Sequence, residues 1–311
     1  MTELNSTHGS GFLLLGFSDV SPRLQILIGA MFTLIYLITL IGNLIIFVIL
    51  TIDPVLQTPM YFFLKNLSLA DIWFTNVTIP KTVTGSLSQN RHISFKGCAT
   101  QMFFFFVFGI TECVLLAVMS FDRYVAICIP LRYMTIMSRS MCTYLASGSW
   151  IMSTVSSLSL TSATFSLPFC ESHEINHFFC DVPPLMELAC GNTFISETVT
   201  TLTSVFTLMV PFLFIIITYT VIVSKIMKIR SAEGRSTAAS TCASHLVSVV
   251  LLYGTTILTY AQPKSSYSME RIFSVCYACL TPMLNPLIYS LRNKEVKGAL
   301  KKLKLRLSKV I

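Results

Sequence analysis

Two acidic residues, Asp71 and Glu112, stand within long stretches of apolar sequence. Ionisable side chains are costly in a hydrocarbon environment, so each is a candidate functional residue. If both face the same interior, they can share a monovalent cation or a proton, because two bare neighbouring carboxylates repel each other at low dielectric. Two interpretations stay open: a site for one monovalent cation or proton, with no other cofactor, or a hydrogen-bonded structural network in which one carboxyl group is protonated.

A charged triplet, Asp122-Arg123-Tyr124, follows one of these apolar stretches directly. A guanidinium beside a carboxylate at the edge of a membrane can be held by that partner and then released to another protein. An isolated triplet of this kind can also be an interfacial anchor. The position of this triplet at the end of an apolar stretch favours an arginine that is held and then released over a simple anchor.

Prolines interrupt two further apolar stretches, Pro211 in one and Pro282 with Pro286 in the other. Prolines inside membrane helices produce kinks that can act as hinges. Asn285 and Tyr289 add an amide and a hydroxyl beside the last of these prolines. The segment is therefore a candidate moving part.

The composition indicates which class of protein must position these residues. Hydrophobic residues make up 53% of the 311 residues and charged residues only 12%, against about 25% charged residues in a typical soluble domain. So few charges exclude a compact soluble protein. They also disfavour an acid–base enzyme, a disordered chain and a nucleic-acid-binding protein.

Seven apolar runs are long enough to cross the hydrocarbon core of a bilayer as helices. They cover roughly residues 24–52, 58–80, 98–121, 141–166, 197–224, 237–262 and 271–291. The period-two alternation of a transmembrane β-barrel is absent. We therefore expect an all-α membrane protein with an outer tail over residues 1–23, a seven-transmembrane helix bundle over 24–291 and a cytoplasmic tail over 292–311.

The distribution of basic residues predicts the orientation of the bundle. Sixteen of the 22 lysines and arginines fall on the side of the C-terminus and six on the other side. The positive-inside rule then places the C-terminus in the cytoplasm and the N-terminus outside the plasma membrane. The sequon Asn5-Ser6-Thr7 lies in the outer tail, which makes Asn5 a candidate glycosylation site.

The C-terminal tail carries apolar residues at helical spacing among lysines. These residues are Val296, Leu300, Leu303 and Leu307. The pattern predicts a short amphipathic helix on the anionic inner surface of the bilayer.

Four of the ten cysteines fall on the outer side, where disulfides can form: Cys98, Cys170, Cys180 and Cys190. Four cysteines permit three pairings, and their spacing does not choose among them. The segment from His177 to Cys180 could also suggest a soft-metal site. We disfavour a metal there, because Cys180 is the expected disulfide partner of Cys98 and too few ligands would remain.

Four segments of this chain, together with the triplet, resemble signatures of one protein family. They are Pro59-Met60-Tyr61-Phe62-Phe63-Leu64, the segment from Met119 to Cys128, the segment Ser240-Thr241-Cys242-Ala243-Ser244-His245-Leu246, and the segment from Pro282 to Asn293. Their order and the long outer loop with three cysteines are similar to those of the olfactory receptors, within the rhodopsin-type G-protein-coupled receptors. Ser120, Phe121, Thr237 and Ala239 depart from the usual family pattern at the cytoplasmic face, which bears on coupling strength or basal activity.

The resemblance implies the disulfides Cys98–Cys180 and Cys170–Cys190, with Cys98–Cys190 still open. It implies that Asp71 and Glu112 form the sodium-type site. It also implies coupling through a heterotrimeric stimulatory olfactory G protein to adenylyl cyclase. The residues expected to take part in coupling and switching are Asp122, Arg123, Tyr124, Tyr219, Asn285, Pro286 and Tyr289.

The resemblance also indicates where a ligand would bind. Phe105 precedes Arg123 by eighteen residues, about 27 Å along a helix. Amine receptors of the wider family carry an aspartate at this point, which this chain lacks. By family analogy, Phe105, Phe106, Gly109 and Ile110 face inward, joined by the hydroxyls of Thr203, Thr207, Thr256 and Tyr260 and, lower down, by Tyr253. An apolar cavity with a few hydroxyls suits small, neutral volatile molecules.

Two other classes of function compete with a receptor. In a membrane transporter, Asp71 and Glu112 would form an ion or proton relay. Transporters usually contain repeated halves with broken helices in matching positions, and the sequence has no such self-similarity. A membrane enzyme is disfavoured, because the chain has neither a paired-histidine metal motif nor a nucleophile elbow.

Overall fold

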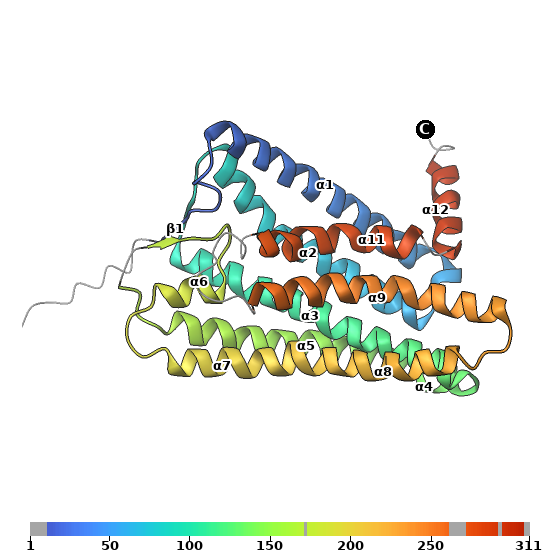
Figure 1. The fold of residues 1–311 in the computed structure, drawn as a ribbon. Helices are drawn as coiled ribbons and strands as arrows, with labels where there is room; N and C mark the ends of the chain where they lie inside the picture. The colour runs from blue at the N-terminus through green and yellow to red at the C-terminus, as the bar shows by residue number, and fades with distance from the viewer. Residues whose placement is uncertain (1–10, 171–172, 261–271, 292–293, 308–311) are drawn as a thin grey trace, which may run out of the picture.

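Seven long helical segments form a bundle within the part of the chain that the computed structural model describes, residues 11–170, 173–260, 272–291 and 294–307 (Figure 1). The first four are α1 (Pro22–Ile52), α2 (Pro59–Leu87), α3 (Phe95–Cys128) and α5 (Arg139–Phe165). The fifth consists of α7 (Phe194–Ser204), a π-helical turn (Val205–Met209) and α8 (Val210–Ile226). The sixth is α9 (Ala232–Tyr260), and the seventh covers residues 272–291, which contain a second π-helical turn (Cys276–Leu280) and α11 (Thr281–Leu291). The predicted all-α bundle is confirmed.

Shorter elements connect the long helices at both ends of the bundle. Two 3₁₀ turns (Pro54–Leu56 and Pro130–Arg132), α4 (Tyr133–Ile136) and α12 (Lys294–Leu307) lie at one end, and α6 (Val182–Glu187) lies at the other. Figure 1 shows α12 running across the axis of the bundle rather than along it. Val296 and Ala299 of α12 are buried, whereas Lys297 and Lys301 are exposed. The amphipathic eighth helix is therefore present.

Polar residues distinguish two of the seven helices from the others. Five segments within the described residues are long and apolar enough to cross a membrane: Pro22–Ile52, Phe95–Cys128, Phe194–Ile226, Ala232–Thr259 and Ile272–Tyr289. Helices α2 and α5 carry more polar residues, but many of these are buried in the bundle, such as Asp71 and Thr75 of α2 and Ser149 and Ser153 of α5. A membrane helix can keep such groups if they face other helices instead of lipid.

A small β-sheet closes the end of the bundle opposite α12. Strand β1 (Phe12–Leu14) pairs antiparallel with β2 (His92–Ile93) and parallel with β3 (Glu174–Ile175). Residues 12–14 thus form a strand within the segment expected to be a simple tail, because Phe12 and Leu14 bury their side chains under the outer loop. Gly11 permits this pairing, since a Cβ atom there would collide with the backbone oxygen of Ile93.

Two disulfides hold the long outer loop in place. Cys98 at the start of α3 is bonded to Cys180, and Cys170 is bonded to Cys190 within the loop. These are the two pairings that the family resemblance implied. Cys98 and Cys180 are fully buried, so the first bond anchors the loop against the top of α3.

Each π-helical turn ends next to a proline. Proline lacks a backbone N–H group, so Pro211 and Pro282 leave carbonyl groups of the preceding turn without their usual donor. The backbone widens to accommodate this loss: the N–H of Val210 bonds to the carbonyl of Val205, and the N–H of Thr281 bonds to that of Cys276. The predicted interruptions therefore take the form of π-helical turns within continuous helices.

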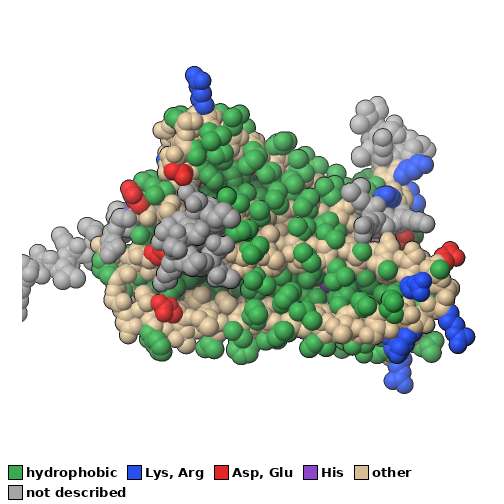
Figure 2. Space-filling model, in the orientation of Figure 1, with side chains coloured by type: hydrophobic (Ala, Val, Ile, Leu, Met, Phe, Trp, Pro, Cys, Tyr) green, Lys and Arg blue, Asp and Glu red, His purple; other side chains and the backbone are tan. Residues whose placement is uncertain are grey.

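The surface of the bundle matches a membrane setting. Figure 2 shows hydrophobic side chains across the middle of the molecule, with the lysine and arginine side chains on this face gathered mostly at the end that carries α12. Many large apolar side chains of α1 and α8 are exposed, among them Leu27, Leu34, Ile41 and Ile217. In water such a surface would drive aggregation, whereas lipid covers it without cost.

Candidate functional site

A buried polar centre joins α1, α2 and α11. Asn285 of α11 donates two hydrogen bonds from Nδ2 to the Asp71 carboxylate, at 3.2 Å to Oδ1 and 3.0 Å to Oδ2. Asn43 of α1 donates to the carbonyl of Pro282 at 3.0 Å. All three side chains are buried. The carbonyl of Pro282 has no helical donor four residues on, because Pro286 lacks an N–H group, and Asn43 supplies a donor from another helix.

Glu112 of α3 completes this centre from the opposite side. It is buried, and it interacts electrostatically with Asp71. Glu112 Oε1, Asn285 Oδ1 and Asn43 Oδ1 have no hydrogen-bond partner among the described residues. Oxygen atoms of this kind are the ligands that hard cations prefer. The donor set fits a single small cation or a shared proton, although no group of three His, Cys, Asp or Glu side chains gathers at any one point of the described chain.

The triplet at the far end of α3 is held by a neighbouring turn. The Tyr133 hydroxyl, from α4, donates a hydrogen bond of 2.8 Å to Oδ1 of the buried Asp122. Burial, followed by the negative charge of Asp122, raises the pKa of Tyr133, so its hydroxyl keeps its proton and remains a donor. Asp122 Oδ2 and Arg123 Nε are buried without a partner among the described residues. Tyr124 is half-buried and stacks on Phe121 at 6.4 Å.

A hydrogen-bonded chain links α8, α9 and α3 near Arg123. The Tyr219 hydroxyl lies 2.8 Å from His245 Nδ1, and His245 Nε2 lies 3.0 Å from the carbonyl oxygen of Leu116. A carbonyl oxygen can only accept, so Nε2 carries the proton. In the neutral imidazole, Nδ1 then accepts from Tyr219. The two rings are also nearly parallel, with centroids 5.6 Å apart.

His245 is a residue whose role the sequence analysis did not assign. It appeared only inside a family motif, because a lone histidine in an apolar helix has no pattern that predicts its partner. The charge of Arg123 reaches both Tyr219 and His245. The structure thus brings two of the expected switch residues, Arg123 and Tyr219, around His245. Tyr289 of α11 packs into the apolar core that also contains Tyr219. Pro286 of the same helix lies against Gly42 of α1.

Aromatic side chains surround Phe105 in the outer half of α3. Its ring centroid lies 4.7 Å from that of Phe179, 5.1 Å from Phe74 and 5.8 Å from Tyr277. Phe105 is buried, whereas its neighbour Phe104 is exposed on the lipid side. The expected inward direction of Phe105 therefore agrees with its contacts.

Phe179 comes from the outer loop, directly before the disulfide-bonded Cys180. The expected disulfide takes the sulfur of Cys180, and the spacing of the segment gave no sign that its phenylalanines reach α3. The His177 ring stacks on Phe178 at 4.6 Å, and Nδ1 lies 3.2 Å from the carbonyl oxygen of Phe179. The disulfide thus holds the outer loop where Phe178 and Phe179 are buried between the helices.

The other α3 residues expected at the ligand site follow the same face. Phe106 is half-buried at 5.1 Å from Phe105, and Ile110 is buried. At Gly109, an added Cβ would come within 3.3 Å of the Phe74 ring. The absence of a side chain there lets α2 approach α3 closely.

The expected hydroxyl groups bond within the bundle. Thr207 donates to the carbonyl of Thr203 at 2.8 Å, and Thr256 donates to that of Leu252 at 2.7 Å. The Tyr253 hydroxyl crosses between helices and donates to the carbonyl of Cys113 on α3 at 3.0 Å. The threonine oxygens keep lone pairs for a ligand, while Tyr253 ties α9 to α3. The side chain of Tyr260 and all of Asn5 lie outside the described residues.

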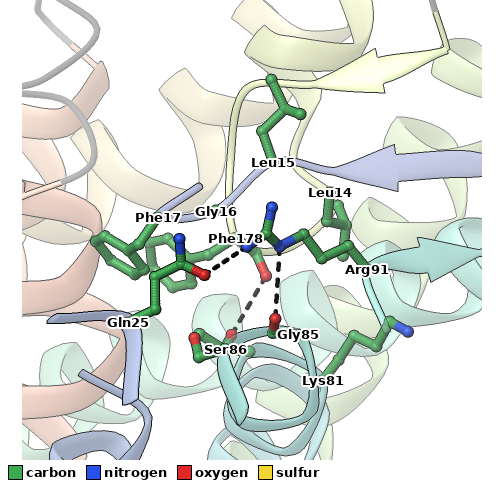
Figure 3. Close-up of a pocket in the computed structure, with 11 residues that line it drawn as sticks. Leu14, Leu15, Gly16, Phe17, Gln25, Lys81, Gly85, Ser86, Arg91 and Phe178 are labelled. Atoms are coloured by element: carbon green, nitrogen blue, oxygen red, sulfur yellow. Dashed lines mark hydrogen bonds between the residues drawn. The ribbon is translucent and has the colours of Figure 1, made fainter. Parts of the chain in front are cut away.

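A small polar cavity lies under the outer sheet, between β1, α1 and α2 (Figure 3). Arg91 donates to Gln25 Oε1 at 2.6 Å and to the carbonyl of Gly85 at 3.4 Å. Thr82 donates to the carbonyl of Phe178 at 3.2 Å. The cavity measures about 20 Å³, room for about one water molecule. These contacts fix Arg91 and the outer loop to α1 and α2. The cavity between them has no space for a small organic molecule.

Known proteins share both the sequence and the fold of this chain. The olfactory receptor family matches residues 32–306. The human olfactory receptor 10A7 is 47% identical over 300 residues, covering 96% of this chain and 95% of the relative. The gorilla olfactory receptor 1G1 is 48% identical over 301 residues, covering 96% of each chain.

A solved structure agrees in fold. Squid rhodopsin superposes with a TM-score of 0.74 over 91% of this chain and 81% of the rhodopsin chain, at 18% identity. Together with the seven-helix bundle and its extra amphipathic helix, these matches place the protein among receptors that cross the membrane several times and are not enzymes. The chain therefore belongs to the olfactory receptors, within the rhodopsin-type G-protein-coupled receptors.

Proposed function

We propose that this receptor binds small, mostly apolar odorants in the outer half of the bundle and activates a heterotrimeric stimulatory, olfactory-type G protein, which raises cAMP. One observation carries the proposal. Helix α3 alone holds the aromatic Phe105 in its outer half, Glu112 at its middle and Arg123 near its other end, and each contacts or acts on residues of other helices. A ligand that moves the outer part of α3 would therefore act on all three levels.

The chemistry around Phe105 supports a neutral ligand. The rings around Phe105 are those of Phe74, Phe106, Phe179 and Tyr277, and Tyr277 brings a hydroxyl group to this cluster. A charged ligand would find no counter-ion in such a cluster, whereas a small volatile molecule with one oxygen atom could exchange contacts with these rings. Phe106, Gly109, Ile110, Thr203, Thr207, Tyr253, Thr256 and Tyr260 are proposed as further ligand contacts.

The opposite end of the bundle is proposed as the G-protein site. Asp122, Arg123 and Tyr124 provide the docking group, while Tyr219, Asn285, Pro286 and Tyr289 take part in the rearrangement. The partly buried Arg123 has an unused Nε donor. The charge of Arg123 acts on the nearby Tyr219 and His245, and we propose that release of their contact accompanies docking of the partner.

We propose that the receptor lies in the plasma membrane with its N-terminus outside and its C-terminus in the cytoplasm. Both disulfides lie at the end of the bundle that carries β1 and the outer loop, and disulfides persist in oxidising compartments. Exposed lysines of α12 lie at the opposite end. A glycan on Asn5, which is proposed as a glycosylation site, would lie on the outer side in this orientation.

Asp71 and Glu112 are proposed to hold one sodium ion or one proton in the resting receptor. Two adjacent buried carboxylates cannot both remain charged without a compensating cation. Asn285 donates to Asp71 from α11, so a change in occupancy would alter the contact between α2 and α11. The pair then regulates switching and does not contact the odorant.

The first test is a screen of volatile compounds with a cAMP reporter in cells that lack other odorant receptors. We expect one or more neutral volatiles to raise cAMP, and Arg123→Ala to abolish this response while still reaching the cell surface. Arg139→Ala is the matched control, because Arg139 is an exposed arginine at the same end, and it should respond as the native receptor does. A full response from Arg123→Ala would contradict the proposed coupling.

Phe105→Asp is expected to abolish the cAMP response to every neutral odorant found in that screen. The new carboxylate would have to be buried among Phe74, Phe179 and Tyr277, where nothing compensates its charge. Phe105→Leu keeps an apolar side chain and should only shift the half-maximal concentration. Surface staining checks that both variants reach the membrane, and an unchanged dose–response for Phe105→Asp would remove this part of α3 from the ligand site.

Glu112→Gln is expected to lower the maximal odorant response by about fivefold or more, the lower range of an allosteric coupling energy. The same variant should lose any dependence of basal cAMP on replacement of sodium by a large organic cation. Glu197→Gln, the same change at an exposed outer position, serves as the control. If Glu112→Gln kept both the response and the sodium dependence, the ion-site proposal would fail.

His245→Leu is expected to raise basal cAMP without odorant, because it removes both hydrogen bonds that connect α9 to α3 and α8. Tyr219→Phe keeps the stacked rings and removes one of these bonds, so its basal signal should rise less. The measurement is ligand-independent cAMP divided by surface receptor. Basal signals equal to native in both variants would show that this chain does not restrain the receptor.

A further inference from the structure

An apolar groove runs between the end of α1 and helix α12, outside the proposed odorant and G-protein sites. Its volume is about 110 Å³. The apolar walls are Val48, Ile49, Ile52, Pro54, Ala299 and Leu303. Ile49 and Ala299 are buried at its base, whereas Ile52 is 58% exposed at its side. The groove therefore opens from the bundle toward the surface that lipid covers.

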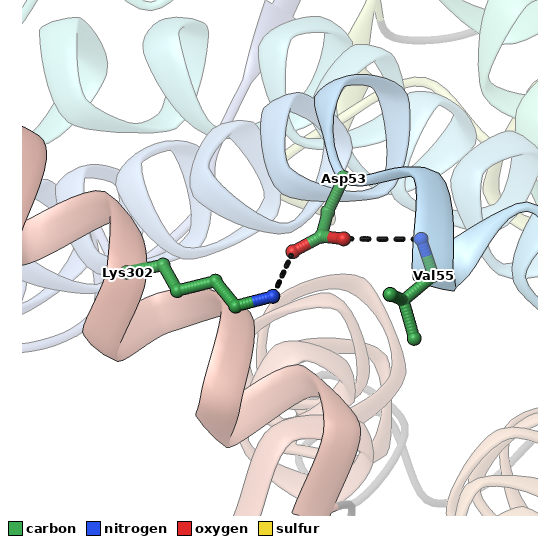
Figure 4. Close-up of polar contacts among 3 residues, drawn as sticks. All are labelled: Asp53, Val55 and Lys302. Carbon is green, nitrogen blue, oxygen red and sulfur yellow. Dashed lines mark hydrogen bonds and ion pairs between the residues drawn. The ribbon is translucent and has the colours of Figure 1, made fainter.

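One ion pair stands at the mouth of this groove (Figure 4). Lys302 Nζ lies 3.4 Å from Asp53 Oδ2, and the two side chains are 62% and 14% exposed. The other Asp53 oxygen accepts a hydrogen bond of 3.1 Å from the N–H of Val55. Asp53 is thus fixed to its own turn, while Lys302 is a long, exposed side chain in a weak surface contact. Such a contact is easily exchanged for another anion.

The groove has a fixed shape because α12 is docked at several points. Val296 and Ala299 are buried against the bundle. Near the start of α12, the Tyr61 hydroxyl from α2 donates a hydrogen bond of 2.7 Å to Glu295 Oε2. Lys297 and Lys301 remain exposed on the same helix. The structure thus combines an apolar groove with one exposed lysine, Lys302, in its lining and further exposed lysines on the same helix.

This combination matches one occupant in chemistry and in position. Helix α12 crosses the end of the bundle beside α1 (Figure 1), where the apolar length of α1 stops at Asp53. A bilayer presents acyl chains on one side of this level and headgroups on the other. Lysines near an anionic lipid surface attract its headgroups.

We propose that the groove binds one phospholipid with a net negative headgroup. One acyl chain lies between Ile52 and Leu303, and the net negative charge of the headgroup takes Lys302 from Asp53. The lipid would then connect α12 to α1, next to the contact that Tyr61 makes with Glu295. The inference depends on the chain spanning a membrane, but it is independent of the proposed odorant, G protein and orientation.

Photo-crosslinking in symmetric lipid nanodiscs tests the site without any signalling readout. Full-length receptor is placed in phosphatidylcholine discs that contain either phosphatidylserine or phosphatidylcholine with a photoreactive acyl chain. Labelled peptides are then identified by mass spectrometry. We expect labelling of residues 48–54 and 299–303, stronger for phosphatidylserine by roughly fivefold, the preference that one lysine contact provides. Equal labelling by the two lipids would overturn the proposal.

Two variants separate the headgroup from the chain. Lys302→Gln should reduce phosphatidylserine labelling to the phosphatidylcholine level, and Ala299→Phe, which fills the groove, should reduce labelling by both lipids. Lys228→Gln, at an exposed lysine beyond the end of α8, should change neither. Because Lys302 is mostly exposed, its variant remains informative even if Ala299→Phe folds poorly. Phosphatidylserine labelling that survives Lys302→Gln, or displacement of the probe by a sterol alone, would refute an anionic phospholipid site.

Discussion

A bilayer core offers no hydrogen bonds, so a polar group inside this receptor is stabilised when it finds a partner on another helix or on its own backbone. Asp71 illustrates the constraint most clearly. Its carboxylate is fully buried and receives both Asn285 contacts from a helix that lies more than two hundred residues away in sequence. This group joins α2 to α11 directly and interacts with Glu112 of α3, so a shift of α11 against α2 would leave a buried carboxyl group without its donor.

Helix α3 connects the levels of the molecule. At the outer end, its disulfide holds the loop that delivers Phe179 to Phe105. Further along, the carbonyls of Cys113 and Leu116 accept hydrogen bonds from Tyr253 and His245 of α9. These two hydrogen bonds attach α9 to α3 within the described part of the bundle. A few hydrogen bonds of this kind give a bundle discrete arrangements, whereas apolar contacts alone would allow it to slide.

Much of the fold could be predicted from the sequence, because its strongest signals are local. Apolar runs of sufficient length predicted seven helices, and the lysines around Val296 and Leu300 predicted the amphipathic helix. Asp71 stood out as a carboxyl group inside an apolar run, and motifs contained Arg123 and Asn285. Helix ends were less predictable: α2 continues to Leu87 and α3 begins at Phe95, because helices extend past the hydrocarbon into water, where an apolar run no longer marks them.

The candidate site was predictable only in part, because its partners come together through tertiary structure. Nothing in the spacing of His245 or Tyr133 predicts contact with Leu116 or Asp122. Phe179 faces Phe105 only because a disulfide folds the loop inward. The strand at residues 12–14 was missed for a similar reason, since its pairing partners lie some 80 and 160 residues further along the chain.

The two π-helical turns have a mechanical consequence. Each contains one residue more per turn than an α-helix, and each lies between the outer and inner parts of its helix, before Pro211 and Pro282. If such a turn tightened to an α-helical turn, everything beyond it would rotate by about 100° around the helix axis. A small change of contacts in the outer half could thus rotate the inner half of the same helix around its axis. A ligand of a few atoms would then not need to separate two helices.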